Sequence, residues 1–398
     1  MSAVTSVTGG SSLYQACSYA TVALLGAVGY YRVTLARASD NAAMSSAATQ
    51  VALATLIALS GFVACTRLIP RMAAACVTSK TSLWGRDINK RRDEKVPESL
   101  GFVCGMVFLS CVILFQPFFH RMLGEYNAAI VSISFALLLG FADDVLDLRW
   151  SVKIALSAVA TLPLLIGYAG PTNVVVPIAL RASLGETVQL GVLYHVYMLL
   201  VAVFCTNSIN IYAGINGLEV GQSLVIAVSV ALHNAVEVAL APPQAAAHHL
   251  LSFVLLLPFI AVSLALFGFN KYPSQVFVGD SYTYFAGMTL AVAGILGHCS
   301  KTLLMLFLPE LINFTLSLPQ LLHIVPIPRH RVPTLDEKTG LLFNSRNYTL
   351  INLYLWAFGP THERTLTRNL LVFQALCSVA VLSVRYYFAY ALYGDRIE

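Results

Sequence analysis

The sequence predicts an all-α polytopic membrane protein, a bundle of ten core transmembrane helices with one further helix at the N-terminal end. Of the 398 residues, 58% are hydrophobic and 11% are charged, whereas about 25% of an average globular chain is charged. The apolar residues form continuous runs of about 20 residues, the length of a membrane-spanning helix. These runs lack the alternation of a membrane barrel strand, and the eight cysteines form no CxxC pair, so neither a barrel nor a disulfide framework is expected.

Eleven segments are apolar and long enough to span a membrane: 12–36, 48–72, 100–120, 126–142, 154–170, 190–208, 217–240, 248–268, 281–298, 300–326 and 368–392. The first is either an extra helix or a targeting signal. We expect a helix, because residues 1–12 contain no Lys or Arg and a signal begins with a charged region. We therefore divide the chain into an N-terminal extension, 1–46, and a membrane-embedded domain, 47–398. The polar linker 38–46 is expected to be a loop, and the valine-rich stretch 174–180 a small hairpin.

If successive spans alternate in direction, most of the 24 Lys and Arg residues fall on one side of the membrane. The positive-inside rule makes this side cytoplasmic. Most Asp and Glu residues fall on the same side, as do Asn210 and Asn216. The groups capable of chemistry are thus expected on the cytoplasmic face.

Two adjacent carboxylates, Asp143 and Asp144, directly follow an apolar span, and Lys153 comes shortly after them. Ionised groups are costly at membrane depth and therefore indicate function. Paired carboxylates near a lysine suit a divalent metal surrounded by phosphates. The alternative is a solvated helix end where the acids meet nearby cations.

Asparagines and glycines interrupt the apolar sequence between two spans. Asn207 and Asn210 share a face if this stretch is helical, and amide oxygens bind magnesium without adding charge. Gly214 and Gly217, on either side of Asn216, permit a tight turn. The alternative is an asparagine-rich turn that caps two helices.

Three other stretches bring polar groups to the same face. Asp280 begins a span, where it is either an N-cap or a metal ligand. Loop 84–99 is either a solvated linker or a cover over the site, and Glu98 is the residue of this loop that we select as a candidate for a role in the site. A proline-stiffened loop carries three cations that suit pyrophosphate or sugar recognition, or that anchor the loop on the cytoplasmic side: Arg329, His330 and Arg331. Together these groups suit phosphoryl transfer from a phosphate-bearing donor to a lipid, and no P-loop, dinucleotide-binding, zincin or hydrolase motif is present.

These motifs resemble those of the polyprenyl-phosphate N-acetylhexosamine-1-phosphate transferases. The matching residues, in the order and spacing of that family, are Phe141-Ala142-Asp143-Asp144, Asn207-x-x-Asn210, Gly214-Ile215-Asn216-Gly217-Leu218, Val278-Gly279-Asp280 and Pro328-Arg329-His330-Arg331. The resemblance runs from about residue 48 to the C-terminus, and within the family the chain is most similar to the eukaryotic branch. It implies Mg²⁺-dependent transfer of GlcNAc-1-phosphate from UDP-GlcNAc to dolichyl phosphate with release of UMP, the first step of N-glycan precursor assembly. It also implies a location in the endoplasmic reticulum membrane, with the site facing the cytosol, and inhibition by tunicamycin. A homodimer is among the expected assemblies.

The resemblance also implies roles for individual residues. Asn210 and Asp280 are expected to bind magnesium, Lys153 the dolichyl phosphate, and Asp143 and Asp144 to lie near the reacting phosphates. Substrate-binding residues are expected at Asn207, at Asn216 and Phe277 around the uracil, at Arg329, His330 and Arg331 around the pyrophosphate and GlcNAc, and at Arg86, Asp87, Ile88 and Glu98 along the nucleotide-sugar side.

The second pKa of a phosphate monoester is near 6, so the acceptor lipid needs no base to become a nucleophile. Direct in-line attack is therefore the preferred mechanism, and a covalent intermediate on Asp143 or Asp144 is its rival. Two other functions compete: a bacterial sister enzyme that transfers phospho-MurNAc-pentapeptide, and a secondary transporter of nucleotide sugars. A transporter would place its polar groups near the bilayer midplane, whereas here they gather on one face.

Overall fold

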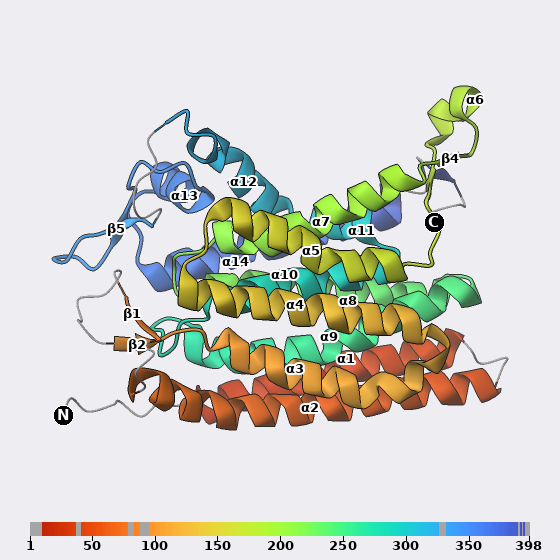
Figure 1. Cartoon of the computed structure of the whole chain (residues 1–398), viewed down its shortest axis with the longest axis horizontal. Coiled ribbons are helices and arrows are strands. Elements are labelled where there is room, and N and C mark those ends of the chain that lie inside the picture. Colours follow the sequence, from red (N-terminus) through yellow and green to blue (C-terminus); the bar gives the residue numbers. More distant parts are fainter. Residues whose placement is uncertain are drawn as a thin grey trace.

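Long helices run side by side along the long axis of the molecule (Figure 1). The computed structural model describes residues 10–36, 41–78, 83–87, 95–325, 332–388, 391 and 393–394. Its main helices are α1 (Ser12–Ala36), α2 (Asn41–Thr78), α3 (Gly101–Phe115), α4 (Leu123–Leu146), α5 (Trp150–Gly167), α7 (Val192–Ile211), α8 (Leu218–Leu240), α9 (Pro243–Asn270), α10 (Gly279–Leu296), α11 (Ser300–Leu306), α12 (Leu308–Leu321) and α14 (Glu363–Ser383). Each predicted segment overlaps one of these helices or the pair α11–α12, so the all-α polytopic fold is confirmed.

Within the described residues, eight helices are long and apolar enough to cross a membrane, and the pair α11–α12 would make a ninth. Segment 300–326, predicted to be long enough to span, is divided into α11 and α12, which meet at an angle of 65°. The break falls at Phe307, and Pro309 stands in the first turn of α12. Proline has no N–H to continue the preceding helix and is tolerated in a first turn.

Short elements connect the helices at both ends of the bundle. Three antiparallel pairs form among the described residues: β1 (Trp84–Arg86) with β2 (Lys95–Pro97), β3 (Asn173–Val175) with β4 (Thr187–Gln189), and β5 (Thr334–Leu335) with β6 (Leu342–Phe343). The remaining short helices are η1 (Gln116–Met122), η2 (Ile178–Leu180), α6 (Arg181–Leu184), α13 (Leu350–Phe358) and η3 (Val384–Phe388).

Two local predictions need correction. A hairpin does begin near residue 174, but 174–180 does not form both of its strands. Pro177 follows β3 and precedes η2, and the partner strand is β4. The linker 38–46 is not all loop either, because α2 already begins at Asn41. The alanines of this stretch favour helix, and the division of the chain at residue 46 stays a prediction.

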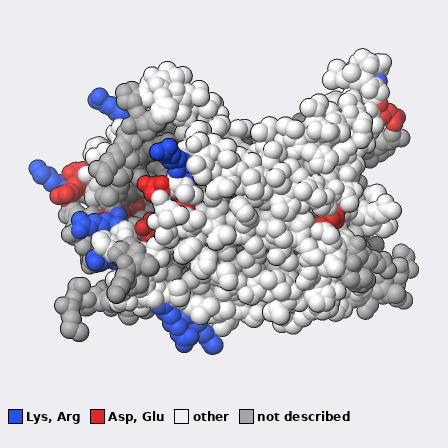
Figure 2. Space-filling model, viewed as in Figure 1, with Lys and Arg blue, Asp and Glu red and all other residues white. Residues whose placement is uncertain are grey.

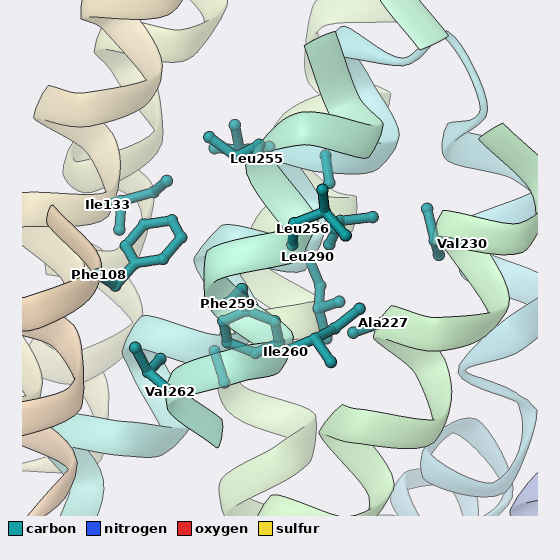
Figure 3. Close-up of a cluster of buried hydrophobic side chains, with 14 of the residues drawn as sticks. Phe108, Ile133, Ala227, Val230, Leu255, Leu256, Phe259, Ile260, Val262 and Leu290 are labelled. Carbon is teal, nitrogen blue, oxygen red and sulfur yellow. The ribbon is translucent and has the colours of Figure 1, made fainter. Parts of the chain in front are cut away.

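The centre of the bundle is α10, which packs against α3, α4, α7 and α9. Residues 281–296 of α10 are all buried. Figure 3 shows part of the surrounding core, where Phe108 of α3 meets Phe259 of α9 edge to face, with ring centroids 6.3 Å apart. Because α10 is enclosed by protein, its polar first turns are held in place by the helices around it.

Charged side chains lie mainly at one end of the molecule. Figure 2 shows Lys, Arg, Asp and Glu gathered around the end that carries β1, β2 and β5, next to a broad uncharged band. The sequence-based sorting of charges to one face agrees with this arrangement. The uncharged band has the character of a lipid-facing surface, since many large apolar side chains of α4, α5 and α7 are exposed, such as Leu138, Ile166 and Leu200.

Candidate active site

A cavity of about 260 Å³ lies at the charged end, where α7 and α9 end and α8 and α10 begin. Its lining brings together segments that are far apart in the sequence: Arg86, Asp87, Glu98, Asn210, Ala213, Gly214, Ile215, Asn216, Glu219, Asn270, Phe277, Val278, Gly279, Asp280, Thr283 and Val332. Seven residues predicted from the sequence belong to this lining. They are Arg86, Asp87, Glu98, Asn210, Asn216, Phe277 and Asp280.

One wall pairs the last turn of α7 with the first turn of α10. The amide of Asn210 donates to the Asp280 carboxylate at 2.5 Å and lies 3.4 Å from the hydroxyl of Thr283. The two helices that carry the acids, α4 and α10, approach closely: a Cβ atom on Gly140 would lie 2.4 Å from the Asp280 carbonyl oxygen. Glycine at this position allows α4 to bring Asp143 and Asp144 up to Asp280.

Lys153 joins two of the acids just outside the cavity. Its ammonium lies 2.7 Å from Asp143 Oδ2 and 3.6 Å from Asp280 Oδ2. Asp143 is buried, and its other oxygen accepts the N–H of Leu148 at 3.0 Å. One lysine thus faces two carboxylates, with Asp144 beside them, so the group keeps an excess of negative charge that suits a cation.

The donor set at this wall fits a magnesium ion. Asp280 supplies a carboxylate and Asn210 an amide oxygen, both lining the cavity. Within the described residues, three or more His, Cys, Asp or Glu side chains nowhere form a ready-made metal cage. Magnesium does not need one, because it usually keeps several waters and binds through one or two carboxylates plus substrate phosphates.

Asp144 faces the backbone of α10. Its two carboxylate oxygens accept the N–H groups of Asp280 at 2.6 Å and Ser281 at 3.1 Å. These belong to the first turn of α10, whose N–H groups have no partner within the helix. Asp144 therefore caps α10 and fixes the backbone that carries Asp280, and it does not line the cavity.

Another part of the lining is the turn between α7 and α8. The Asn216 side chain donates to Asp87 at 3.1 Å and accepts the N–H of Ser274 at 2.8 Å. Its backbone N–H donates to Glu363 at 2.7 Å, and its carbonyl accepts from Thr367 at 3.1 Å. Asn216 therefore ties its own turn to three other segments, those of Asp87, Ser274 and α14, at the edge of the cavity.

The strand segment β2 and the residues before α10 form a third side. The N–H of Phe277 donates to the Pro97 carbonyl at 2.7 Å, and the N–H of Leu100 donates to the Phe277 carbonyl at 3.2 Å. The Phe277 ring and Glu98 both lie against Gly85 of β1. Burial, together with the nearby charge of Asp144, raises the pKa of Glu98 above its ordinary value. The loop 84–99 is thus a structured part of the site where it is described.

The other eight predicted residues lie away from the lining or outside the described part of the chain. Asn207 lies one turn before Asn210 on α7, but its amide donates to the Val203 carbonyl of its own helix at 2.8 Å, and it does not line the cavity. Lys153, Asp143 and Asp144 contact the lining residue Asp280 from outside. Ile88, Arg329, His330 and Arg331 lie outside the described residues.

Sequence reasoning did not select several lining residues. Glu219 accepts the N–H of Gly214 at 3.1 Å and so closes the turn that Asn216 belongs to. Asn270 and Thr283 line the cavity from α9 and α10. Glu219 lies close in the sequence to Asn216, and Asn270 precedes Asp280, whereas Glu363 reaches Asn216 from 147 residues away and gave no local signal.

Comparison with known proteins agrees with the resemblance. The family model described as Glycosyl transferase family 4 matches residues 126–298. A protein of Dictyostelium discoideum named UDP-N-acetylglucosamine--dolichyl-phosphate N-acetylglucosaminephosphotransferase is 49% identical over 350 residues, which cover 81% of this chain and 85% of that protein. This chain belongs to the family of UDP-N-acetylglucosamine--dolichyl-phosphate N-acetylglucosaminephosphotransferases.

Two other relatives carry the same name. The protein of Saccharomyces cerevisiae is 37% identical, with 84% of this chain and 91% of the relative covered. The protein of Leishmania amazonensis is 36% identical, with 91% of this chain and 99% of the relative covered. The family predicted from the motifs is confirmed, and the match extends well beyond the motif residues.

Proposed function

We propose that this protein transfers GlcNAc-1-phosphate from UDP-GlcNAc to dolichyl phosphate, giving GlcNAc-PP-dolichol and UMP, the first step of N-glycan precursor assembly. The observation that carries the proposal is the cavity itself. It lies at the charged end of an apolar bundle, with the Asn210–Asp280–Lys153–Asp143 group on one side and the Asn216 turn on the other. Carboxylate, amide and ammonium groups near exposed apolar side chains support a reaction between phosphates and a lipid at this end of the bundle.

Asn210 and Asp280 are the residues that would hold Mg²⁺, which when bound neutralises charge on the phosphates and on the UMP leaving group. Lys153 stands at the start of α5, where it is half-buried and next to the exposed apolar residue Val152. An ammonium at this boundary suits the phosphate of a lipid whose chain lies along the bundle. Asp143 orients Lys153 through the contact at 2.7 Å.

The reaction follows from the charge of the acceptor. A phosphate monoester is largely dianionic at neutral pH, so its oxygen attacks the β-phosphorus directly. A bond forms between the lipid phosphate oxygen and the β-phosphorus, and the bond from that phosphorus to the bridging oxygen breaks, with the electron pair leaving on UMP. The contacts of Asp143 and Asp144 support this mechanism over a covalent one, because the oxygens of both carboxylates are engaged with Lys153 or backbone N–H groups.

The nucleotide is expected on the side of the cavity formed by the Asn216 turn and Phe277. The Phe277 ring offers a face for stacking on uracil. Because both side-chain groups of Asn216 are bound to Asp87 and Ser274, we assign Asn216 the task of holding this wall in shape. Arg86 and Glu98 lie on the same side, and the loop that contains Arg329, His330 and Arg331 is proposed to grip the pyrophosphate and GlcNAc.

We further propose that the protein resides in the endoplasmic reticulum membrane with the cavity facing the cytosol. The excess of cations on that side supports this orientation. Inhibition by tunicamycin and assembly as a homodimer complete the proposal, and both rest on the family resemblance.

The test uses purified protein in detergent with magnesium, UDP-GlcNAc and dolichyl phosphate, and follows UMP release with and without tunicamycin. Asp280→Asn keeps the size of the side chain and removes its charge, and Glu186→Gln, at the opposite end of the molecule, is the matched control. We expect lipid-dependent UMP release that tunicamycin and Asp280→Asn abolish and Glu186→Gln leaves unchanged. Uptake of UDP-GlcNAc into proteoliposomes without UMP release would instead establish a transporter.

A further inference from the structure

The N-terminal helix α1 is fastened to the bundle near both of its ends. It packs against α2, α8 and α9. Near its start, the Tyr14 hydroxyl donates to the Leu264 carbonyl of α9 at 2.6 Å. Near its end, the Arg32 guanidinium donates to the Ala235 and Val236 carbonyls of α8, at 3.2 Å each. α1 is therefore an integral helix of this bundle. It contacts α8, which follows the Asn216 turn, and α9, which precedes the Ser274 segment.

The Tyr14 ring packs against α9 at Gly268, where the absence of a side chain leaves room for it. A Cβ atom on Gly268 would lie 2.8 Å from a ring carbon of Tyr14, so a larger residue would push the ring away. The Lys271 ammonium lies 3.9 Å from the ring centroid, and the Phe267 ring is 6.5 Å away, centroid to centroid. A cation over an aromatic face is attracted by the ring quadrupole, so Tyr14 holds Lys271 where α9 ends.

The other side of Lys271 and Phe267 touches the cavity wall. Gly217 has a φ of +83°, and a Cβ atom there would lie 3.2 Å from Lys271 Cα and 3.3 Å from the Phe267 ring. Gly217 directly follows Asn216, whose side chain accepts the N–H of Ser274. Three layers therefore lie in succession: the Tyr14 ring, then Lys271 and Phe267, then the turn that lines the cavity.

We propose that Tyr14 is a positioning residue for the nucleotide-binding wall of the cavity. It acts through Lys271 and Phe267, which support the Asn216–Gly217 turn and begin the segment that leads to Ser274 and Phe277. The inference rests on the proposed function, since it assumes that this wall binds UDP-GlcNAc. Removing the ring takes away the support on one side of Lys271, and the wall then spends more of its time in arrangements that do not fit the nucleotide.

The expected effect is on nucleotide binding, while the chemical step is preserved. In Tyr14→Ala we expect the KM for UDP-GlcNAc to rise roughly fivefold, which corresponds to about 1 kcal/mol of binding free energy, with kcat within about twofold of the wild type. Tyr14→Phe keeps the ring over Lys271 and loses only the hydroxyl, so its KM should stay close to the wild-type value. Leu13→Ala, a change in a neighbouring side chain that is 71% exposed, is the matched control.

The experiment combines steady-state kinetics with calorimetric binding of UDP-GlcNAc to the purified full chain. Lys271→Met, which removes the cation and keeps the alkyl chain, should weaken binding in the same direction and serves if Tyr14→Ala does not fold. A folded Tyr14→Ala protein with wild-type affinity would overturn the inference, as would a fall in kcat at unchanged KM or a Tyr14→Phe protein as weak as Tyr14→Ala. A wild-type protein that binds no UDP-GlcNAc would refute the proposed function itself, and the positioning role with it.

Discussion

Asp144→Asn separates two possible roles of this acid, a cap of α10 and a nucleophile in the reaction, which the sequence alone leaves open. In the structure the Asp144 carboxylate accepts two backbone N–H groups of α10, at 2.6 Å and 3.1 Å. Asparagine has nearly the same shape, but its amide nitrogen is a donor and would face one of those N–H groups. The substitution therefore removes one hydrogen bond to a charged acceptor, about 1.5–3 kcal/mol. It also removes the negative charge at the N-terminus of α10, about 0.3–1 kcal/mol.

The cap and the reaction are linked through Asp280, because one of the two N–H groups is its own. We expect Asp144→Asn to lower the free energy of unfolding by about 2–4 kcal/mol. We also expect it to reduce kcat by roughly 10- to 100-fold, since a displacement of about 1 Å at a reacting group has a cost of that order. Both effects should appear together. A nucleophilic Asp144 would behave differently, with activity abolished and stability nearly unchanged.

The assay measures thermal unfolding in detergent and UMP release on the same preparations. Asp147→Asn is the matched control, because Asp147 is exposed three residues further on and has a φ of +49°, a conformation that asparagine tolerates well. We expect this control to match the wild type in both measurements. Full stability with no turnover in Asp144→Asn, or a phospho-sugar trapped on Asp144 of the wild-type enzyme in single turnover, would refute the capping role.

Three further predictions concern other buried or paired groups. Lys153→Met leaves Asp143 and Asp280 without their cation and should lower kcat/KM for dolichyl phosphate by about 10²-fold. Lys153→Arg should recover part of this loss, and equal losses in both variants would contradict a simple charge role. Because the folded-state pKa of Glu98 is raised by burial and then by Asp144, the wild type should lose stability as the pH rises from the ordinary Glu pKa through the raised one, and melting curves of Glu98→Gln should lack this slope. Glu310 is fully buried, and neither of its carboxylate oxygens has a hydrogen-bond partner among the described residues. Glu310→Leu should therefore raise the free energy of unfolding by about 1–3 kcal/mol. A lower melting temperature of this variant would show that the carboxyl group has a stabilising partner in the folded protein.

The residues that sequence reasoning located were those whose chemistry conflicts with an apolar surrounding. Asp143, Asp144, Asn210 and Asp280 stand next to or inside runs of apolar residues, and a polar group in such a place is costly unless it has a function or a partner. The structure brings these four side chains into one group. That these four residues belong to a functional site could therefore be predicted from the polarity of the sequence around them.

What each polar group contacts could not be predicted in the same way. Whether Asp144 faces a substrate or the backbone of α10 depends on a contact across 136 residues. The bond from Asn216 to Glu363 spans 147 residues. Local patterns report the period and polarity of a segment, whereas these contacts depend on how two helices meet. The same limit explains why α1, predicted as an extra helix, gave no indication that Tyr14 would reach α9.

The least apolar of the central helices shows why the site lies where it does. α10 is outside the group of helices that are apolar enough to cross a membrane, yet residues 281–296 are entirely buried. A helix enclosed by other helices does not have to match the lipid, so its first turn can carry Asp280 and Thr283 at the cavity. That freedom exists only if the exposed N–H groups of the first turn find a partner, and the Asp144 carboxylate of α4 provides it. The acid that caps α10 and the acid that faces the cavity are therefore parts of one arrangement: replacing Asp144 should displace Asp280, whereas replacing the Asp280 side chain leaves the two backbone N–H groups that hold Asp144 in place.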